Sequence, residues 1–424
     1  MNFDRMRALL LDQAIRGELV PQLIEEGSIE QLGDRKGLFD IPKTWGWFEF
    51  SKVVKTVSSK DNQIPAKEIS QKGRFPVVTQ SKNSLIDGYS EEEHKLVSKE
   101  FLPLLVFGDH TRFLKYVDFQ FIVGADGTKL IRPKDDQLVN CSYLYYVLKA
   151  LVPETKDRGY SRHFQFLKKL MIPVPPLREQ CRIVARVEKL LSKIDRAEKA
   201  YQELQTLSSV LRGQILQEAI QGKLVPQLDS EAEVQQIGDS PEEVPFAIPE
   251  KWKWINLKLI SKALSDGSHN PPPNAGQGIP VLSAKNVFDG QVHAETANRW
   301  ATEEDWKLED KKVHIEKGDV LLTIVGTIGR TAVVGDIERF MLQRSVCVIK
   351  PQGEILDSHY LSLMLNAPAM LEWMMDRAAG TAQKGVYLRT LKDMPFPVPP
   401  VQEQVRIVTK VKELLRQVKA LSGR

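Results

Sequence analysis

Apolar residues between positions 183 and 215 recur at alternating intervals of four and three, and this spacing predicts one long amphipathic helix. It is the spacing of a coiled-coil seam running through almost five heptads. Pro175 and Pro176 are expected to begin the helix, because proline is tolerated only in the first helical turn, and Gly222 and Pro226 to end it. A helix of ~40 residues extends about 60 Å. The predicted seam consists of Ile183, Val187, Leu190, Ile194, Ala197, Tyr201, Leu204, Ser208, Leu211 and Ile215.

The chain repeats several of its segments, including the start of this helix. LKKLMIPVPPLREQCRIVARVEKLL at 167–191 returns as LKDMPFPVPPVQEQVRIVTKVKELL at 391–415. AIRGELVPQL at 14–23 returns as AIQGKLVPQL at 219–228, and IPKTWGW at 41–47 returns as IPEKWKW at 248–254. Two matching halves indicate a protein that performs one operation at two places.

The C-terminal copy of the helix reaches Arg424 with half of its seam, and the matching half is found at the N-terminus. Subtracting 205 from Ser208, Leu211 and Ile215 gives Phe3, Met6 and Leu10. We therefore expect the two terminal helices together to imitate the central one and to pack antiparallel to it, which gives the chain a circular pseudo-two-fold symmetry. Two unrelated amphipathic helices facing local cores are the alternative. The C-terminal seam consists of Ile407, Val411, Leu414 and Val418.

The rest of the sequence predicts two globular domains of mixed α/β type, in the α+β fold class. Short apolar runs typical of strands occur in both domains, and 141–151 and 358–375 have helical character. The strand-like runs are 75–80, 102–108, 119–124, 279–284, 319–326 and 345–350. The expected division is an N-terminal helix and connector at 1–40, a first domain at 41–170, a central helical region at 171–247, a second domain at 248–393 and a C-terminal helical region at 394–424.

The overall composition excludes few classes of protein. The net charge of +4 suits a nucleic-acid partner and an ordinary soluble protein equally. Cys141, Cys181 and Cys347 are far apart and form no CxxC pair, so we expect a reduced, cytoplasmic protein. The N-terminal segment has no long apolar run and no stretch of 18 apolar residues exists, so neither a signal peptide nor a membrane span is expected.

Several fragments resemble catalytic motifs without completing one. Asn270-Pro271-Pro272-Pro273 approaches the [DNS]PP[FYW] motif of amino-methyltransferases, but that chemistry needs an aromatic fourth residue to stack on a flipped base. Glu154 and Lys156 match a fragment of a metal-dependent nuclease, a pattern short enough to arise often by chance. The loop 326–329 lacks the Lys-Ser/Thr of a P-loop, and the histidines have no metal-ligand spacing. These absences favour a binding subunit over an enzyme.

Polar and basic residues follow the predicted strands in both domains, and these loops are the candidate DNA-binding surface. Gln, Asn and Arg can bind adenine and guanine edges through two hydrogen bonds, and Lys suits phosphates. Arg112 and Arg330, beyond the similar runs LLVFG and LTIVG, are the preferred equivalent pair. Each residue alone is explained equally well as an ordinary polar loop residue. The candidates are Gln80, Lys82, Asn83, His110, Arg112, Tyr160, Arg162, His269, Asn270, Lys285, Asn286, Thr327, Arg330, Gln343, Arg344 and Lys384.

The doubled PVPPLREQCRIVARVEKLL and PVPPVQEQVRIVTKVKELL, with the doubled A-I-x-G-x-L-V-P-Q-L, resemble the specificity (S) subunits of type I restriction–modification systems. GTAQKGVYLRTLKDMPFPVPP at 380–400 is similar to the end of a target-recognition domain in that family. The resemblance covers the whole chain. It implies that 41–170 and 248–393 each bind one half of a split, asymmetric DNA target, and that the helices between them fix the gap.

The resemblance also implies partners and cofactors. Two modification (methyltransferase) subunits would hold S-adenosylmethionine and methylate adenine at N6, and restriction subunits would add cleavage that depends on ATP and magnesium. The chain itself would bind double-stranded DNA, hold no cofactor or metal and catalyse nothing. Because the family has no transferable base code, the candidate residues depend on loop chemistry and repeat position. A coiled-coil scaffold without sequence-specific DNA binding is the alternative function.

Overall fold

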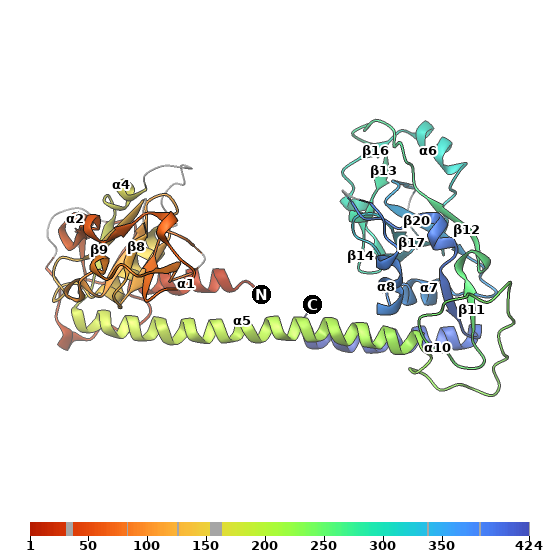
Figure 1. The fold of residues 1–424 in the computed structure, drawn as a ribbon, viewed down its shortest axis with the longest axis horizontal. Coiled ribbons are helices and arrows are strands. Elements are labelled where there is room, and N and C mark those ends of the chain that lie inside the picture. Colours follow the sequence, from red (N-terminus) through yellow and green to blue (C-terminus); the bar gives the residue numbers. More distant parts are fainter. Residues whose placement is uncertain are drawn as a thin grey trace. The chain divides into compact units, whose positions relative to one another are not determined.

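The computed structural model describes residues 1–30, 37–82, 84–124, 127–152, 163–336, 339–380 and 383–423. The chain divides into two compact units, Met1–Tyr201 and Gln202–Arg424. One helix, α5 (Leu177–Ile220), runs through the division, and each unit has its own sheets and hydrophobic cores (Figure 1). Among the described helices, none combines the length and the apolar composition that a membrane span requires.

In the first unit, α1 (Phe3–Arg16) lies along the first half of α5 (Figure 1). At its start, the ring of Phe3 lies 5.9 Å from the ring of Tyr201. One turn later, Arg7 pairs with Asp195 at 2.7 Å. The sequence positions in α1 rise while those in α5 fall, so the two helices are antiparallel, as predicted.

In the second unit, α10 (Val401–Ser422) lies along the other half of α5 in the same way. The side-chain amide of Gln205 donates a hydrogen bond to the Ser422 carbonyl at 3.1 Å. At the opposite end of α10, Gln227, just beyond α5, donates to the carboxylate of Glu403. Each terminal helix therefore pairs with its own half of α5 within its own unit.

The first unit contains two four-stranded sheets. One is antiparallel, in the order β2-β9-β6-β7, and the other has the order β3-β8-β4-β5. One hydrophobic core fills the space between the two sheets. A second core packs the outer face of the antiparallel sheet against α3, α1 and the start of α5. The bounds are β2 (Val54–Val57), β3 (Gln63–Ile64), β4 (Phe75–Val78), β5 (Gly88–Ser90), β6 (Leu104–Gly108), β7 (Leu114–Val117), β8 (Ile122–Gly124), β9 (Thr128–Pro133) and α3 (Cys141–Leu151).

The second unit repeats this architecture. Its antiparallel sheet has the order β12-β20-β17-β18, and a smaller sheet has the order β16-β13-β19. The parallel pair β13 and β19 corresponds to the parallel pair β4 and β8. The bounds are β12 (Ser261–Asp266), β13 (Ile279–Leu282), β14 (Val287–Phe288), β15 (Gln291–Val292), β16 (Trp300–Ala301), α6 (Glu303–Asp310), β17 (Val320–Thr323), β18 (Thr331–Val333), β19 (Met341–Leu342), β20 (Val346–Pro351), α7 (Ser358–Met364), α8 (Pro368–Asp376) and α9 (Leu388–Lys392).

In each unit, a two-stranded antiparallel sheet pairs a strand near the start of the globular domain with the strand that precedes α5 or α10. In the first unit β1 (Gly46–Glu49) pairs with β10 (Met171–Val174), and in the second β11 (Lys253–Asn256) pairs with β21 (Pro395–Val398). The segments IPKTWGW and MIPVPP thus repeat together because they are partners in one sheet. The short helices α2 (Phe50–Val53) and α4 (Phe164–Leu167) complete the first unit.

Most predicted elements are present. The α+β fold class is confirmed, α5 begins directly after Pro176, and 141–151 is a helix with the predicted bounds. Each of the six strand-like runs contains a strand. The predicted helix at 358–375 is two helices, α7 and α8, because Pro368 begins a new helix at its first turn.

The predicted seam is buried over only part of α5. Ile183 and Val187 are buried, as are Ile407, Val411 and Val418 of α10, and Leu190, Ile194, Tyr201 and Leu414 are half-buried. Ala197, Leu204 and Leu211 are exposed, the two leucines at 37% and 38%, so their placement in the seam was wrong. A strict seven-residue repeat drifts around a straight helix with 3.6 residues per turn. Ser208 and Ile215, two further members of the predicted seam, are buried in this half, together with Ala219, which the prediction did not include.

Buried glutamines explain why the repeated proline motif is followed by Glu-Gln. Gln180 and Gln404 are fully buried and make the same three hydrogen bonds. Each side-chain oxygen accepts from a backbone N–H at 2.8 Å, that of Asn140 before α3 or of Asp357 before α7. Each side-chain NH₂ group donates to two backbone carbonyls, one before that helix and one in the proline motif. The glutamine thus fixes the start of α3 or α7 to the start of α5 or α10.

Glu179 and Glu403, one residue earlier, are also buried. Glu179 accepts a hydrogen bond from Gln22 at 3.1 Å, and Glu403 accepts one from Gln227 and one from the Trp252 indole at 3.0 Å. Burial raises the pKa of both carboxyl groups, and these hydrogen bonds oppose the shift. We call Glu179, Gln180, their counterparts Glu403 and Gln404, and the segments that their hydrogen bonds join the duplicated frame.

The repeated A-I-x-G-x-L-V-P-Q-L requires its glycine for the same reason in both units. Gly17 and Gly222 have φ of 76° and 69°, a left-handed conformation that ends a helix. A Cβ atom at Gly17 would lie 2.4 Å from Pro42, and one at Gly222 would lie 2.3 Å from Pro249. Only glycine allows the chain to turn this close to the IPxxW segment.

Candidate nucleic-acid interface

In the first unit, the loops that follow β4, β6 and β8 converge on one edge of the two sheets. The Thr111 hydroxyl donates to the Gln80 carbonyl at 2.7 Å, and the His110 backbone N–H donates to the Gln80 side chain at 3.2 Å. The Asp109 N–H donates to the Gly127 carbonyl at 2.6 Å. We call residues 79–82, 84–87, 109–113 and 127 the first loop cluster. It brings the candidates Gln80, Lys82, His110 and Arg112 together.

A buried ion pair holds the longest loop of this cluster in place. The Asp87 carboxylate lies 2.7 Å from the Lys115 ammonium, and these side chains are 9% and 2% exposed. Asp87 also accepts hydrogen bonds from the Thr79 N–H at the start of the loop and from the Ser84 hydroxyl within it. Burial by itself would raise the pKa of Asp87, but the bonds from Lys115 and Thr79 hold that pKa below its ordinary value.

The expected equivalence of Arg112 and Arg330 is wrong by one position. Arg112 has φ 59°, and its N–H donates to the Gly108 carbonyl at the end of β6. In the second unit, Gly329 has φ 94° and donates to the Thr323 carbonyl at the end of β17. Arg112 therefore corresponds to Gly329. The two hairpins differ in length, so the ungapped match of LLVFG with LTIVG aligns Gly108 with Gly326, although Gly108 occupies the place of Thr323.

Arg112 also has a structural role. One of its terminal nitrogens donates to the Val152 carbonyl at 2.7 Å, and its side chain is half-buried. The guanidinium therefore links the hairpin after β6 to the end of α3. This contact positions the hairpin.

In the second unit, five loops converge in the same manner. The Ser268 N–H donates to the Leu342 carbonyl at 2.7 Å, and the Arg344 N–H donates to the Ser268 carbonyl at 3.0 Å. The Ser345 hydroxyl accepts from the Ala284 N–H at 3.1 Å. The Gly326 N–H donates to the Lys384 carbonyl at 3.3 Å, which ties the loop before α9 to the hairpin after β17. We call 266–270, 283–286, 324–330, 343–345 and 383–387 the second loop cluster.

Most candidates in the second loop cluster are accessible. Gln343 is half-buried, and seven others are exposed: His269, Asn270, Lys285, Thr327, Arg330, Arg344 and Lys384. The exception is Asn286, which is 6% exposed. Its oxygen accepts from the Ser283 N–H at 2.9 Å and its NH₂ group donates to Thr296 at 2.9 Å, so this side chain closes a turn and cannot contact a base.

The proline loop at 270–273 is held by an arginine from another strand end. The guanidinium of Arg299 donates to the carbonyls of Pro271 and Pro272. These contacts fix a stiff loop beside His269, which itself lies 2.7 Å from Asp266. The contacts support the interpretation of this segment as a rigid loop.

Asn83, Tyr160 and Arg162 lie outside the described residues, as do Glu154 and Lys156. Where the chain is described, no three metal-ligating side chains lie together.

Sequence analysis missed two groups of residues in the first loop cluster. The Asp87–Lys115 pair joins residues 28 positions apart, and their spacing gives no signal. Leu85, Ile86 and Phe113 are exposed at 43%, 36% and 39%. Their position in or beside loops was visible in the sequence, but their exposure was not.

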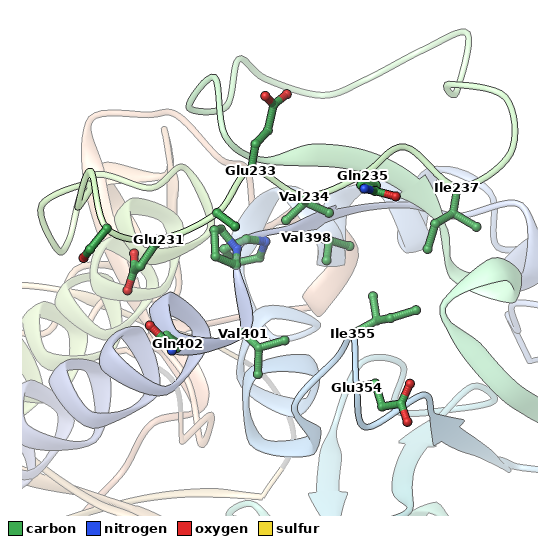
Figure 2. A pocket seen from close by; sticks show the side chains of 14 residues that line it. Glu231, Glu233, Val234, Gln235, Ile237, Glu354, Ile355, Val398, Val401 and Gln402 are labelled. Atoms are coloured by element: carbon green, nitrogen blue, oxygen red, sulfur yellow. The ribbon is translucent and has the colours of Figure 1, made fainter.

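A hollow of about 550 Å³ lies elsewhere, between the connector 230–237 and the start of α10 (Figure 2). Its walls include Val234, Ile355 and Val401, with carboxylates at Glu233 and Glu354 (Figure 2). An acidic rim repels the phosphates of nucleic acid. The residues that line it include none of the candidate DNA-binding residues.

Comparison with known proteins gives consistent matches. The family described as Type I restriction modification DNA specificity domain matches residues 42–206 and 249–423. The EcoBI specificity subunit of Escherichia coli is 28% identical over 58% of this chain and 52% of its own length. The chain thus spans about half of that relative. The EcoAI specificity subunit of Escherichia coli is 26% identical over 97% of this chain and 89% of its own.

Solved structures share the fold. A chain from a study of complex assembly and conformational transition of the type I R-M system has a TM-score of 0.64 at 18% identity, covering 91% of this chain and 93% of its own. The HsdS subunit from Thermoanaerobacter tengcongensis has a TM-score of 0.51 at 17% identity, with the same coverage of both chains. With the family match over both halves, the chain belongs to the type I restriction–modification DNA specificity family.

Proposed function

We propose that this chain is the DNA specificity subunit of a type I restriction–modification complex and recognises a bipartite, asymmetric target. The observation that carries the proposal is the pair of loop clusters: two equivalent sheet edges, supported by one duplicated frame, present different side chains. Equivalent supports favour one mode of DNA binding, and different side chains favour two different half-sites. Joining the two sites in one chain makes the second contact intramolecular.

The proposed partners follow from the relatives, whose names describe specificity subunits of restriction enzymes. Two modification subunits would bind S-adenosylmethionine and methylate adenine at N6, and restriction subunits would use ATP and magnesium to cleave DNA. The chain itself would bind no cofactor and catalyse nothing. The complex would act in the cytoplasm, where the host chromosome is its substrate.

The direct test is to co-express the chain with its modification subunit and to map N6-methyladenine in the host chromosome. The expected result is methylation at one split sequence whose two parts are separated by a constant number of unspecified bases. Methylation at random sites, or none, would contradict the proposal. Titration of random and target duplexes at one salt concentration separates it from the scaffold function, which predicts equal affinity for both.

A further inference from the structure

The first loop cluster exposes apolar side chains among polar ones. Leu85 and Ile86 lie in the loop after β4, and Phe113 lies at the end of the hairpin after β6. Isolated exposed apolar residues are common on protein surfaces, but a group of them beside a binding surface indicates a contact. Whether these three form one group depends on how their two loops lie.

Hydrogen bonds on both sides of Phe113 place its hairpin along the loop after β4. Two residues before Phe113, the Thr111 hydroxyl donates to the Gln80 carbonyl at 2.7 Å. Two residues after it, the Lys115 ammonium reaches Asp87 at 2.7 Å. Leu85 and Ile86 immediately precede Asp87 in the chain. The three apolar side chains therefore share the edge that carries Gln80 and Lys82.

The second unit has an arginine where the first has Phe113. The N–H of Gly108 at the end of β6 donates to the Phe113 carbonyl at 2.9 Å, and the N–H of Thr323 at the end of β17 donates to the Arg330 carbonyl at 2.8 Å. Phe113 and Arg330 thus close equivalent hairpins, and both are exposed. Arginine suits the two acceptors of guanine, whereas phenylalanine has no hydrogen bond to offer a base.

We propose that Phe113, with Leu85 and Ile86, contacts thymine methyl groups, so that the first unit recognises a half-site containing thymine. The C5-methyl of thymine is the apolar group that the bases present in the major groove of DNA. An exposed apolar side chain gains free energy there by removing this methyl group from water. The inference rests on the proposed function, and it names the chemistry of one half-site.

The test replaces thymidine by deoxyuridine, which removes the methyl group and leaves the hydrogen-bonding groups unchanged. Once mapping has given the target, the half-site of the first unit is the one that changes when residues 41–170 are exchanged. Duplexes with single thymine-to-uracil changes are then titrated with the complex of this chain and its modification subunits. Each contacted methyl group is expected to contribute about four-fold in affinity.

A variant cycle identifies the side chain. Phe113→Ala is expected to weaken binding of the thymine duplex and to abolish the further effect of uracil at the contacted position. Thymine-to-uracil changes in the other half-site should have the same effect in the wild type and in Phe113→Ala. Leu38→Ala, which shortens a side chain that is 78% exposed in the connector, is the matched control and should bind like the wild type.

Three results would overturn the inference. The first would be that the bipartite target is methylated but its first half-site contains no thymine, or that uracil duplexes of this half-site bind as tightly as the thymine duplex. In that case the proposed function stands. The second would be that Phe113→Ala weakens association with the modification subunit and leaves DNA binding unchanged. The apolar group would then be a contact for that subunit. Finally, if no target is methylated or bound, the proposed function fails, and this inference fails with it.

Discussion

At the scale of single residues, the duplicated frame depends on buried polar side chains that form hydrogen bonds with backbone groups of the same chain. Gln404 is fully buried and bridges the start of α7 to the proline motif before α10, and Gln180 does the same in the first unit. A buried amide that loses its partners leaves backbone groups without hydrogen bonds, which is costly. This is why Glu-Gln recurs at the same point of both halves.

Gln404→Ala is therefore expected to lower the free energy of unfolding by about 2–4 kcal/mol, because it leaves one buried N–H and two carbonyls without this partner. Thermal and denaturant unfolding of the full chain measures the change. Gln402→Ala removes the same side chain from an exposed position of the same helix and should change stability by less than about 0.5 kcal/mol. Equal effects of the two variants would contradict the role of the buried amide.

Glu403 predicts a pH dependence. Burial raises its pKa in the folded state above that in the unfolded chain, so the folded protein binds this proton more tightly. Its contribution to stability is full below the unfolded pKa and is lost as the pH rises through the folded pKa. The free energy of unfolding of the wild type, relative to Glu403→Gln, should therefore fall as the pH rises from about 4. Denaturant titrations at several pH values measure it, and Glu179→Gln should show the same trend. A constant difference would contradict it.

At the scale of elements, α5 serves both units, and each unit buries its own part of the helix. Ile183 and Val187 are buried against the first unit, whereas Ser208, Ile215 and Ala219 are buried in the second. The seven-residue pattern identified the helix and its antiparallel partners. In the second half it identified Ser208 and Ile215 correctly and Leu204 and Leu211 wrongly, because a strict seven-residue repeat drifts around a helix with 3.6 residues per turn.

Inserting four helical residues after Ala197 lengthens α5 by about 6 Å and turns the following part by only about 40°. We expect the methylated target to gain about two base pairs between its half-sites, because base pairs are spaced 3.4 Å apart. Mapping of N6-methyladenine measures the gap. The matched control is the same insertion after Asp239, an exposed connector residue, which should leave the gap unchanged. Unchanged spacing in the helix variant would mean that α5 does not set the distance.

At the scale of the whole molecule, one frame is used twice with two different loop clusters. The sheet orders β2-β9-β6-β7 and β12-β20-β17-β18 correspond, and so do the hydrogen bonds of Gln180 and Gln404. The equivalent hairpins carry different exposed side chains, since Phe113 in the first unit occupies the position of Arg330 in the second. This difference supports the proposal that each unit recognises its own half-site.

Replacing residues 41–170 by the corresponding domain of another family member should change one half-site and leave the other half-site intact. The physical reason is that each loop cluster is formed entirely within its own unit. Methylome mapping of the chimera shows which bases change. A control chimera that replaces 248–393 should change the other half-site, and a chimera that alters both would disprove independent recognition.

The sequence by itself determined the duplication, the α+β class, the long central helix and the antiparallel terminal helices, because these follow from repeats and local periodicity. It also placed most candidate DNA-binding residues on loops that do converge. The tertiary structure alone decided that Asn286 is buried, that Arg112 supports a hairpin, and that Phe113 corresponds to Arg330. Such assignments depend on hydrogen bonds between residues far apart in the chain, and local sequence patterns do not record which loops meet.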